Sequence, residues 1–326
     1  MILISPIDVP PLPTDDADAV LIDTNIPATA TGEAEWNSGT SYVAGNIVSV
    51  LGSIQRRYES LTSNSNKSPP DNPSDWLDLG STNRWKMFDQ GTLTLTRQAE
   101  TIDVTLAAKG LVNSIAMFNV SAASIQIIVT AAGATTPSYD KTFDFLVGLS
   151  ESNWWYYFYE TTLIADTPEQ DSVVLDMPQL IDPTEQIIIT RGDSGETDPN
   201  EQPSIGELIV GKQQKLGASL FGSSVGIRDY SKKEADVFGN FQVIERRFSK
   251  YGDFDVVVET QKVSEVQKAL ASRRATPTVY LGSERACLSC QPNINSETLI
   301  YGYYRDFSVV LSNRNTSMLS IDVEGL

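Results

Sequence analysis

The sequence predicts a mainly β protein: a small β module, an antiparallel β-sandwich and a C-terminal α+β unit with one helix on an antiparallel sheet. Apolar and polar residues alternate along many short runs of about four to seven residues. Gly, Pro and Asp separate these runs, and one segment has the apolar spacing of an amphipathic helix. At 326 residues the chain is long enough for roughly two or three domains with their own cores.

The composition changes along the chain and divides it into segments. Residues 1–34 are rich in Pro, Asp, Thr and Ala, which predicts an extended arm and linker with one short strand at 19–22. Residues 35–82 carry spaced aromatic side chains among turn residues and predict a module with few aliphatic residues for a core. Residues 83–205 predict the sandwich, and residues 206–326 predict the α+β unit.

Candidate strands combine alternation with bounding turn residues. In the sandwich they are residues 93–97, 102–106, 114–120, 124–129, 154–160, 172–175 and 186–190. In the last segment they are residues 241–247, 254–259, 278–281, 298–304, 307–311 and 318–323. The helix is predicted at residues 263–274, where apolar residues share one face and Arg273 and Arg274 suit the negative end of the helix dipole.

The composition argues against several classes of function. The chain has 24 basic and 42 acidic residues, and its net charge of −18 opposes nucleic acid as a partner. It contains no histidine, which removes Ser-His-Asp chemistry, imidazole acid–base catalysis and the commonest zinc ligand. We therefore expect no catalytic residues and no cofactor. The first residues lack a basic flank, and no uncharged apolar run reaches the ~18 residues of a spanning helix, so we expect a soluble chain made in the cytoplasm.

Two features resemble metal ligands without completing a site. Cys287 and Cys290 supply half of a four-sulfur zinc site, so reduced thiols or a local disulfide are favoured over a metal or disulfide shared between subunits. The acidic loop 192–201 clusters Asp193, Glu196, Asp198 and Glu201, but their spacing departs from a calcium-binding EF-hand. We expect a solvated loop and no metal site.

The densest aromatic run is residues 154–159. In a strand its side chains alternate, so one set can fill the sandwich core while the other faces outward. The outward set is expected to be Trp155, Tyr157 and Tyr159. A neighbouring domain or subunit is favoured as its cover, with a ligand as the alternative, because Tyr and Trp are frequent interface anchors.

Residues 35–80 resemble the chitin- and cellulose-binding modules of carbohydrate-binding families 5 and 12. The pattern consists of Trp36, the run Tyr42-Val-Ala-Gly45, a strand from Asn46 to Val50 leading to Tyr58, a Pro-rich loop at 68–73, and Trp76. The resemblance implies that Trp36, Tyr42, Tyr58 and Trp76 contact sugar, since an aromatic face suits the C–H side of a sugar ring. The alternative is that these rings form the core of a module too small to have another.

A larger resemblance is to tail-tip and baseplate proteins of long-tailed bacteriophages. It is carried by Ser81-Thr-Asn-Arg-Trp-Lys-Met-Phe-Asp89, by residues 205–211 and 301–307, and by the ending Ile321-Asp-Val-Glu-Gly-Leu326. It implies a virion protein at the tail tip, similar to a distal tail protein, with residues 206–326 forming a ring as a trimer or hexamer. The implied partners are the tail tube, the baseplate hub and cell-surface polysaccharide.

Two further functions stay as alternatives at this point. In the first, the module targets a polysaccharide hydrolase, which would need two carboxylates at glycosidase separation in a groove. In the second, the protein is a secreted adhesin, which the lack of a recognisable signal peptide disfavours.

Overall fold

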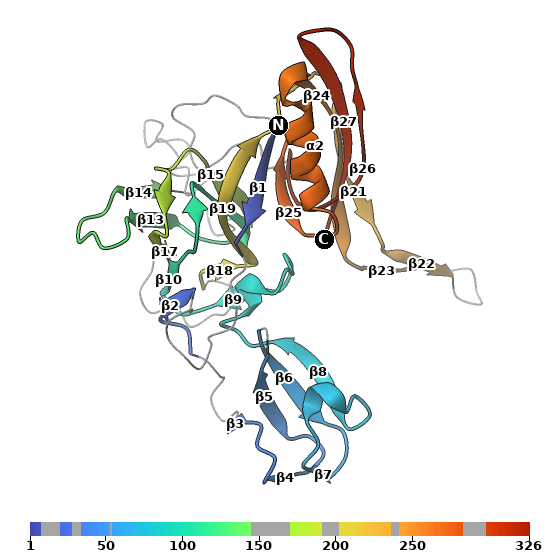
Figure 1. Cartoon of the computed structure of the whole chain (residues 1–326). Coiled ribbons are helices and arrows are strands. Elements are labelled where there is room, and N and C mark those ends of the chain that lie inside the picture. Colours follow the sequence, from blue (N-terminus) through green and yellow to red (C-terminus); the bar gives the residue numbers. More distant parts are fainter. Residues whose placement is uncertain are drawn as a thin grey trace, which may run out of the picture. The chain divides into compact units, whose positions relative to one another are not determined.

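The computed structural model describes residues 1–7, 20–27, 34–52, 54–144, 170–190, 202–235, 241–282 and 298–326 (Figure 1). It is mainly β, as predicted, and the α-helix of the described residues, α2 (Val263–Ser272), lies within the predicted helical range. The chain forms two compact units. Unit 1 comprises Met1–Pro6, Ser172–Leu175 and Gly211–Leu326, and unit 2 comprises Ile7–Asp171 and Asp176–Val210.

Unit 1 contains a curled antiparallel sheet in the order β19, β1, β25, β26, β27 and β24, with β20 and β21 both paired to β24. The strands of this unit are β1 (Ile2–Pro6), β20 (Ala218–Ser219), β21 (Ser224–Asp229), β22 (Lys232–Ala235), β23 (Phe241–Ile244), β24 (Phe248–Glu259), β25 (Thr278–Leu281), β26 (Leu299–Val310) and β27 (Thr316–Gly325). Of these, β22 and β23 form a separate two-stranded sheet. Two strands, β15 (Gln170–Val174) and β19 (Glu207–Lys215), run across the boundary between the units. The short helix η5 (Thr260–Lys262) leads into α2.

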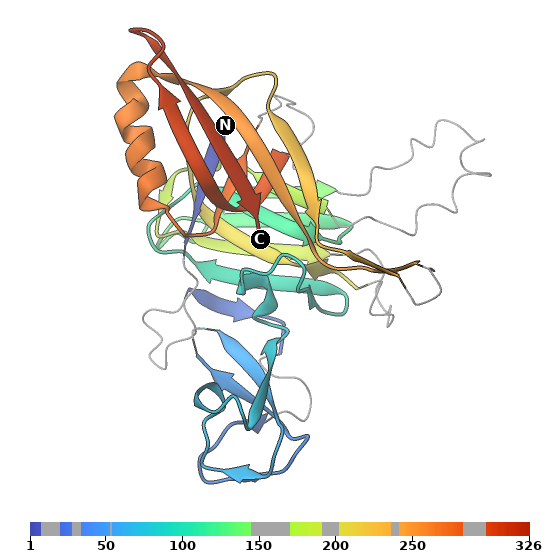
Figure 2. The ribbon, with the colours of Figure 1, turned by 90° about the vertical axis from the view of Figure 1, so that its right-hand side faces the viewer.

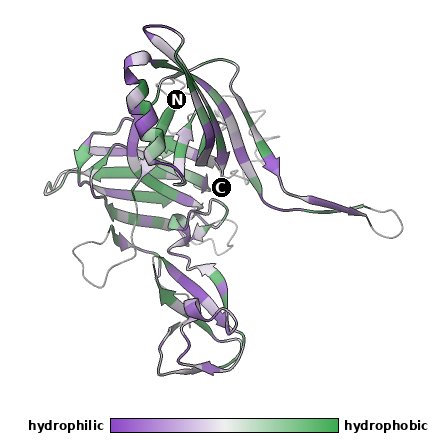
Figure 3. Ribbon diagram, turned by 45° about the vertical axis from the view of Figure 1, so that its right-hand side comes forward, coloured by the Kyte–Doolittle hydropathy of each residue, from purple (hydrophilic) through white to green (hydrophobic). Residues whose placement is uncertain are grey.

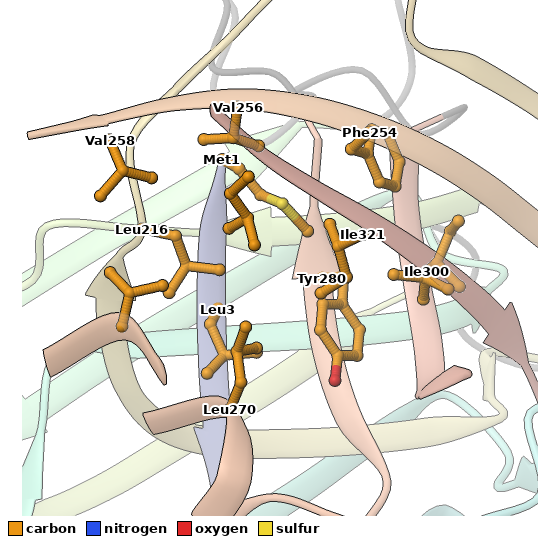
Figure 4. Packing of buried hydrophobic residues seen from close by; sticks show 13 residues of the cluster. Met1, Leu3, Leu216, Phe254, Val256, Val258, Leu270, Tyr280, Ile300 and Ile321 are labelled. Atoms are coloured by element: carbon orange, nitrogen blue, oxygen red, sulfur yellow. The ribbon is translucent and has the colours of Figure 1, made fainter. Parts of the chain in front are cut away.

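The core of unit 1 lies between the sheet and α2, which runs along one side of the sheet in Figure 2. Val266 and Leu270 are one helical turn apart, so both point from α2 toward the sheet, and both are buried. Figure 4 shows the cluster around them, whose other buried members are Met1, Leu3, Leu216, Phe254, Val256, Val258, Tyr280, Ile300, Leu319, Ile321 and Val323. Helix and sheet therefore share one continuous apolar layer.

The N-terminal residues differ from the arm predicted over residues 1–34. β1 pairs with β19 on one side and with β25 on the other, and Ile2, Leu3 and Ile4 have no exposed surface. The amino group of Met1 donates a hydrogen bond to the Gly217 carbonyl at 2.6 Å. Successive side chains of a strand point to opposite faces, so the burial of three aliphatic residues in a row shows that both faces of β1 are covered.

The predicted strands 298–304 and 307–311 are one strand, β26. Its pairing with β27 continues on both sides of a register shift between Tyr304 and Asp306. A β-bulge of this kind adds a residue without ending the ladder, so the break that the sequence predicts at residues 305–306 does not divide the strand.

Unit 2 contains a five-stranded antiparallel sheet in the order β14, β13, β17, β10 and β2. Its strands are β2 (Leu21–Thr24), β10 (Thr101–Ala107), β13 (Ser124–Thr130), β14 (Tyr139–Asp144) and β17 (Thr184–Thr190). Further strands of the unit are β9 (Thr96–Arg97), β11 (Leu111–Val112), β12 (Ser114–Val120), β16 (Leu180–Ile181) and β18 (Ser204–Ile205), and a short helix, η3 (Lys86–Phe88), precedes them. Alternate residues of β10, β13 and β17 are buried, as the sequence pattern predicts.

The predicted small module is the part of unit 2 built from residues 34–81. Its sheet has the order β3, β5, β6 and β8, and β4 pairs with β7. The strands are β3 (Ala34–Glu35), β4 (Ser41–Tyr42), β5 (Ile47–Leu51), β6 (Gln55–Ser60), β7 (Asn64–Ser65) and β8 (Trp76–Ser81), with a short helix, η2 (Pro69–Asp71), before β8. In the described part of the chain, no helix has both the length and the apolar composition needed to cross a membrane.

Candidate functional site

Three of the predicted sugar-contacting residues form the core of the module. Tyr42, Tyr58 and Trp76 lie on β4, β6 and β8 and pack with Val48 of β5. The rings of Tyr42 and Trp76 meet edge to face, with centroids 5.2 Å apart and planes inclined at 70°. Burial also raises the pKa of the Tyr58 hydroxyl. The side chains of this cluster thus replace the aliphatic core that the module lacks.

Polar atoms of the cluster are hydrogen-bonded inside the module. The Tyr42 hydroxyl accepts a bond from the Asn37 backbone N–H at 2.7 Å, and the Trp76 indole N–H donates to the Lys67 carbonyl at 3.1 Å. Exposed fractions are only 7% for Tyr42, 8% for Tyr58 and 2% for Trp76. A ring this buried offers no face to a sugar, so in this structure these three residues stabilise the module and do not form a binding platform.

Trp36 differs from the other three predicted contacts. It is only partly buried and packs against the cluster, and its backbone N–H donates to the Ser49 carbonyl at 2.9 Å. Its indole N–H is buried without an acceptor among the described residues. Of the four predicted rings, Trp36 is the one with accessible surface for stacking.

The structure also exposes an apolar surface that the sequence analysis did not single out. β21 pairs with β24 in antiparallel fashion, from the Ser224–Asp253 pair to the Asp229–Phe248 pair. Beyond these strands, β22 pairs with β23, from the Lys232–Ile244 pair to the Ala235–Phe241 pair. We call residues 229–235 and 241–248 the ribbon. Figure 3 shows the ribbon extending past the sheet to which β21 and β24 belong.

One face of the ribbon is apolar and open to solvent. Phe241 and Val243 are two residues apart, so they share a face, and they are 65% and 68% exposed. The ammonium group of Lys233 lies 3.9 Å from the centroid of the Phe241 ring on that face. Within the described residues, the two strands of the ribbon pair only with each other. The alternation of residues 241–247 predicts a strand, but alternation alone does not show which face lacks a cover.

Two buried carboxyl groups have raised pKa values. Glu185 of β17 is paired with Leu106 of β10 on one side and with Val129 of β13 on the other. Neither of its carboxyl oxygens has a hydrogen bond to a described residue. Burial raises its pKa from 4.5 to about 8, opposed by the nearby backbone N–H groups of Ala108 and of Glu185 itself.

Glu207, at the start of β19, has a pKa well above its ordinary value because of burial and the nearby charge of Asp89, opposed by the Gln90 backbone N–H. Raised pKa values are typical of general acids, but Glu185 has no exposed surface and Glu207 is 4% exposed. Neither carboxyl group can reach a polymeric substrate in this structure.

A cavity of about 260 Å³ lies in unit 1. Its lining residues are Ser219, Leu220, Phe221, Gly222, Ser223, Val225, Phe254, Gly282 and Thr298. None of them is a carboxylate or an amine, so this cavity holds neither an acid–base pair nor an ion-binding set. The described residues also contain no cluster of three or more Asp, Glu or Cys side chains arranged to hold a metal ion.

Several predicted features lie outside the described residues. They are the interface candidates Trp155, Tyr157 and Tyr159, the cysteines Cys287 and Cys290, and the acidic loop 192–201.

Comparison with known proteins gives no relative: no family model, no curated protein and no solved structure matches the chain.

Proposed function

We propose that the protein is a structural component of a bacteriophage tail tip or baseplate, where copies of the chain form a ring with other tail proteins. The proposed ring is a trimer or hexamer that contacts the tail tube and the baseplate hub. The sequence resemblance described above supports the tail assignment. The ribbon supports assembly, because its exposed apolar face needs a partner surface.

The ribbon has the physical properties of a surface that contacts another subunit. An isolated two-stranded ribbon is marginally stable in water, and unpaired strand edges readily accept further strands. Phe241 and Val243 add exposed apolar area that contact with another subunit would remove from water. When a ribbon on one copy docks on a different surface of the next copy, the contact generates a ring if the rotation closes.

The ribbon prediction can be tested by the double substitution Phe241→Ser with Val243→Ser. We expect self-association to weaken by about tenfold or more, because truncating a central apolar anchor typically costs more than about 1 kcal/mol. Sedimentation velocity over a range of concentrations measures the change. The matched control is Val310→Ser with Leu311→Ser, which removes two other exposed apolar side chains of unit 1. Equal association of the ribbon variant and the unmodified chain would count against the ribbon as the assembly surface.

We also propose that the module binds a cell-surface polysaccharide, with Trp36 as the stacking residue. Weak binding at each copy becomes avid when a ring presents several modules together. Trp36→Ala is expected to lower the affinity for chitin or cellulose oligosaccharides by about tenfold, since stacking contributes most of the apolar contact with a sugar. Titration calorimetry measures this, with Leu77→Ala, at another exposed apolar position of the module, as control. Unchanged affinity in the Trp36 variant would remove this residue from the proposed site.

A further inference from the structure

Three aspartates form a row across neighbouring strands of the sheet in unit 1. Asp322 of β27 is paired with Asp253 of β24 on one side and with Asp306 of β26 on the other. Asp253 and Asp306 are exposed, and Asp322 is partly exposed. We call these three residues the acidic row. Side chains directly opposite each other on neighbouring strands have Cβ atoms about 4.5–5.5 Å apart, so strand pairing alone places the three carboxylates side by side.

The burial of neighbouring residues shows which face of the sheet carries the acidic row. Phe254 of β24 and Ile321 of β27 are buried in the core that α2 covers, and Phe307 of β26 packs against this core. Each of them is next in sequence to a member of the acidic row, and successive side chains of a strand point to opposite faces. The acidic row therefore lies on the outer face of the sheet, opposite to α2.

The basic residues beside the acidic row are bound to another carboxylate. Glu324, further along the same face of β27, forms ion pairs with Arg228 of β21 and with Arg305 of β26. Burial, followed by the charge of Asp253, raises the pKa of the Asp322 carboxyl, and Arg305 opposes this shift only in part. The acidic row thus keeps an excess of negative charge, and like charges directly opposite each other across a sheet are destabilising.

The apolar face of the ribbon carries a positive charge. Lys233 is paired with Val243, so it lies on the same face, and its ammonium group is over the Phe241 ring. An ammonium group in this position keeps its charge and can still donate hydrogen bonds to a carboxylate. Lys232 and Glu234 lie on the opposite face, where they form an ion pair with each other. In β22 and β23 the apolar face is therefore cationic.

The base of the ribbon adds further cations. Arg246 and Arg247 are exposed, and neither forms an ion pair with a described residue. Their one acidic neighbour in sequence is Glu245. Guanidinium groups bind carboxylates through paired N–H donors. Together with Lys233, these two residues give the ribbon cations that complement the charge of the acidic row.

One copy of the chain does not bring its ribbon onto its own acidic row. Val243 and Asp253 belong to β23 and β24, which follow each other along one extended run of chain. At about 3.3 Å per residue of strand, the two residues are on the order of 30 Å apart. Figure 3 shows the ribbon extending past the sheet, away from the strands that carry the row. Contact between the two surfaces therefore requires a second copy.

We propose that the acidic row is the surface on which the ribbon of a second copy docks, with Lys233 of that ribbon against the carboxylates. The inference rests on the proposed ring assembly and names the surface that receives the ribbon. Opposite charges on the two surfaces steer their encounter and fix how they align. Because ribbon and acidic row are different surfaces of each copy, the contact repeats from copy to copy and generates a ring if the rotation closes.

The first test removes charge from the acidic row. Asp253→Asn with Asp306→Asn keeps both side chains close to their size at exposed positions, so the variant should fold. Self-association in sedimentation velocity should weaken by about tenfold, since close charge pairs across an interface contribute on this order. Its dependence on NaCl should also become flatter, because salt screens such pairs. The control, Glu259→Gln with Glu265→Gln, removes two exposed carboxylates of unit 1 outside the acidic row.

A mixing experiment then tests direct contact between the two surfaces. A chain with Phe241→Ser and Val243→Ser keeps its acidic row but has a weakened ribbon. A chain with Asp253→Lys and Asp306→Lys keeps its ribbon but has a reversed charge on the row. Each variant alone should associate weakly. Their mixture should form a complex of one copy of each, because one intact ribbon can meet one intact row.

The outcomes separate this inference from the proposed assembly. Unchanged association of the Asp253→Asn and Asp306→Asn variant would overturn the acidic row as the receiving surface and leave the ribbon proposal standing. The same holds if the mixture gives no complex while the unmodified chain self-associates. An unmodified chain that stays monomeric would overturn both the proposed ring and the docking surface.

Discussion

Replacing Trp76 by alanine is expected to unfold the module while unit 1 stays folded. Trp76 is nearly fully buried, packs against Tyr42 and is hydrogen-bonded to the Lys67 carbonyl. Truncating a buried Trp to Ala typically costs about 3–5 kcal/mol. A module of this size has little stability to lose. Hydrogen exchange followed by mass spectrometry should therefore show lost protection over residues 34–81 and unchanged protection over β24 and β25.

The control for this prediction is Trp76→Phe, which keeps an aromatic ring and should retain most of the protection. The core of unit 1 contains no residue of the module, which is why we expect its protection to persist. Retained protection of the module in Trp76→Ala would show that the aromatic cluster is not its core.

Replacing Glu185 by glutamine is expected to stabilise the protein at neutral and alkaline pH. The folded-state pKa is about 8 against 4.5 for an unburied carboxyl group, so unfolding releases a proton between these values. The free energy of unfolding is then highest below pH 4.5, falls as the pH rises, and reaches its lower level above pH 8. The difference at pH 7 is about 3 kcal/mol for a shift of this size. Glutamine resembles the protonated acid and has no such dependence.

Urea denaturation at pH 5 and pH 8 measures this effect. The unmodified chain should lose more stability between the two pH values than Glu185→Gln does. Glu207 contributes a slope of the same sign in both proteins, so the comparison isolates Glu185. Glu265→Gln, on the exposed side of α2, should behave like the unmodified chain. Parallel pH profiles for the unmodified chain and Glu185→Gln would contradict a buried neutral carboxyl group.

The fold was predictable where a single physical signal dominates. Residues 114–120 and 278–281 are β12 and β25 with the predicted limits, because dense β-type residues end at turn residues. The helix was predictable from its periodicity. The N-terminal strand was not, because the prolines after Ile4 suggest a linker and the covering strands of β1 are more than two hundred residues away along the chain.

The candidate site was less predictable for the same reason. The sequence places Trp36, Tyr42, Tyr58 and Trp76 in one module, but only the three-dimensional packing shows which rings are buried. Glu185 lies one residue before the predicted strand 186–190, and acidic residues are rarely buried without a partner, so nothing in the pattern singles it out.

We propose that the protein assembles through the exposed apolar face of the ribbon, and its mass in solution tests this most directly. Light scattering on the purified chain over a range of concentrations, with and without the tail proteins proposed as partners, should give a trimer or hexamer, and electron microscopy should show a closed ring at the end of the proposed tail. A chain that stays monomeric under every condition and is absent from the particle would contradict the account.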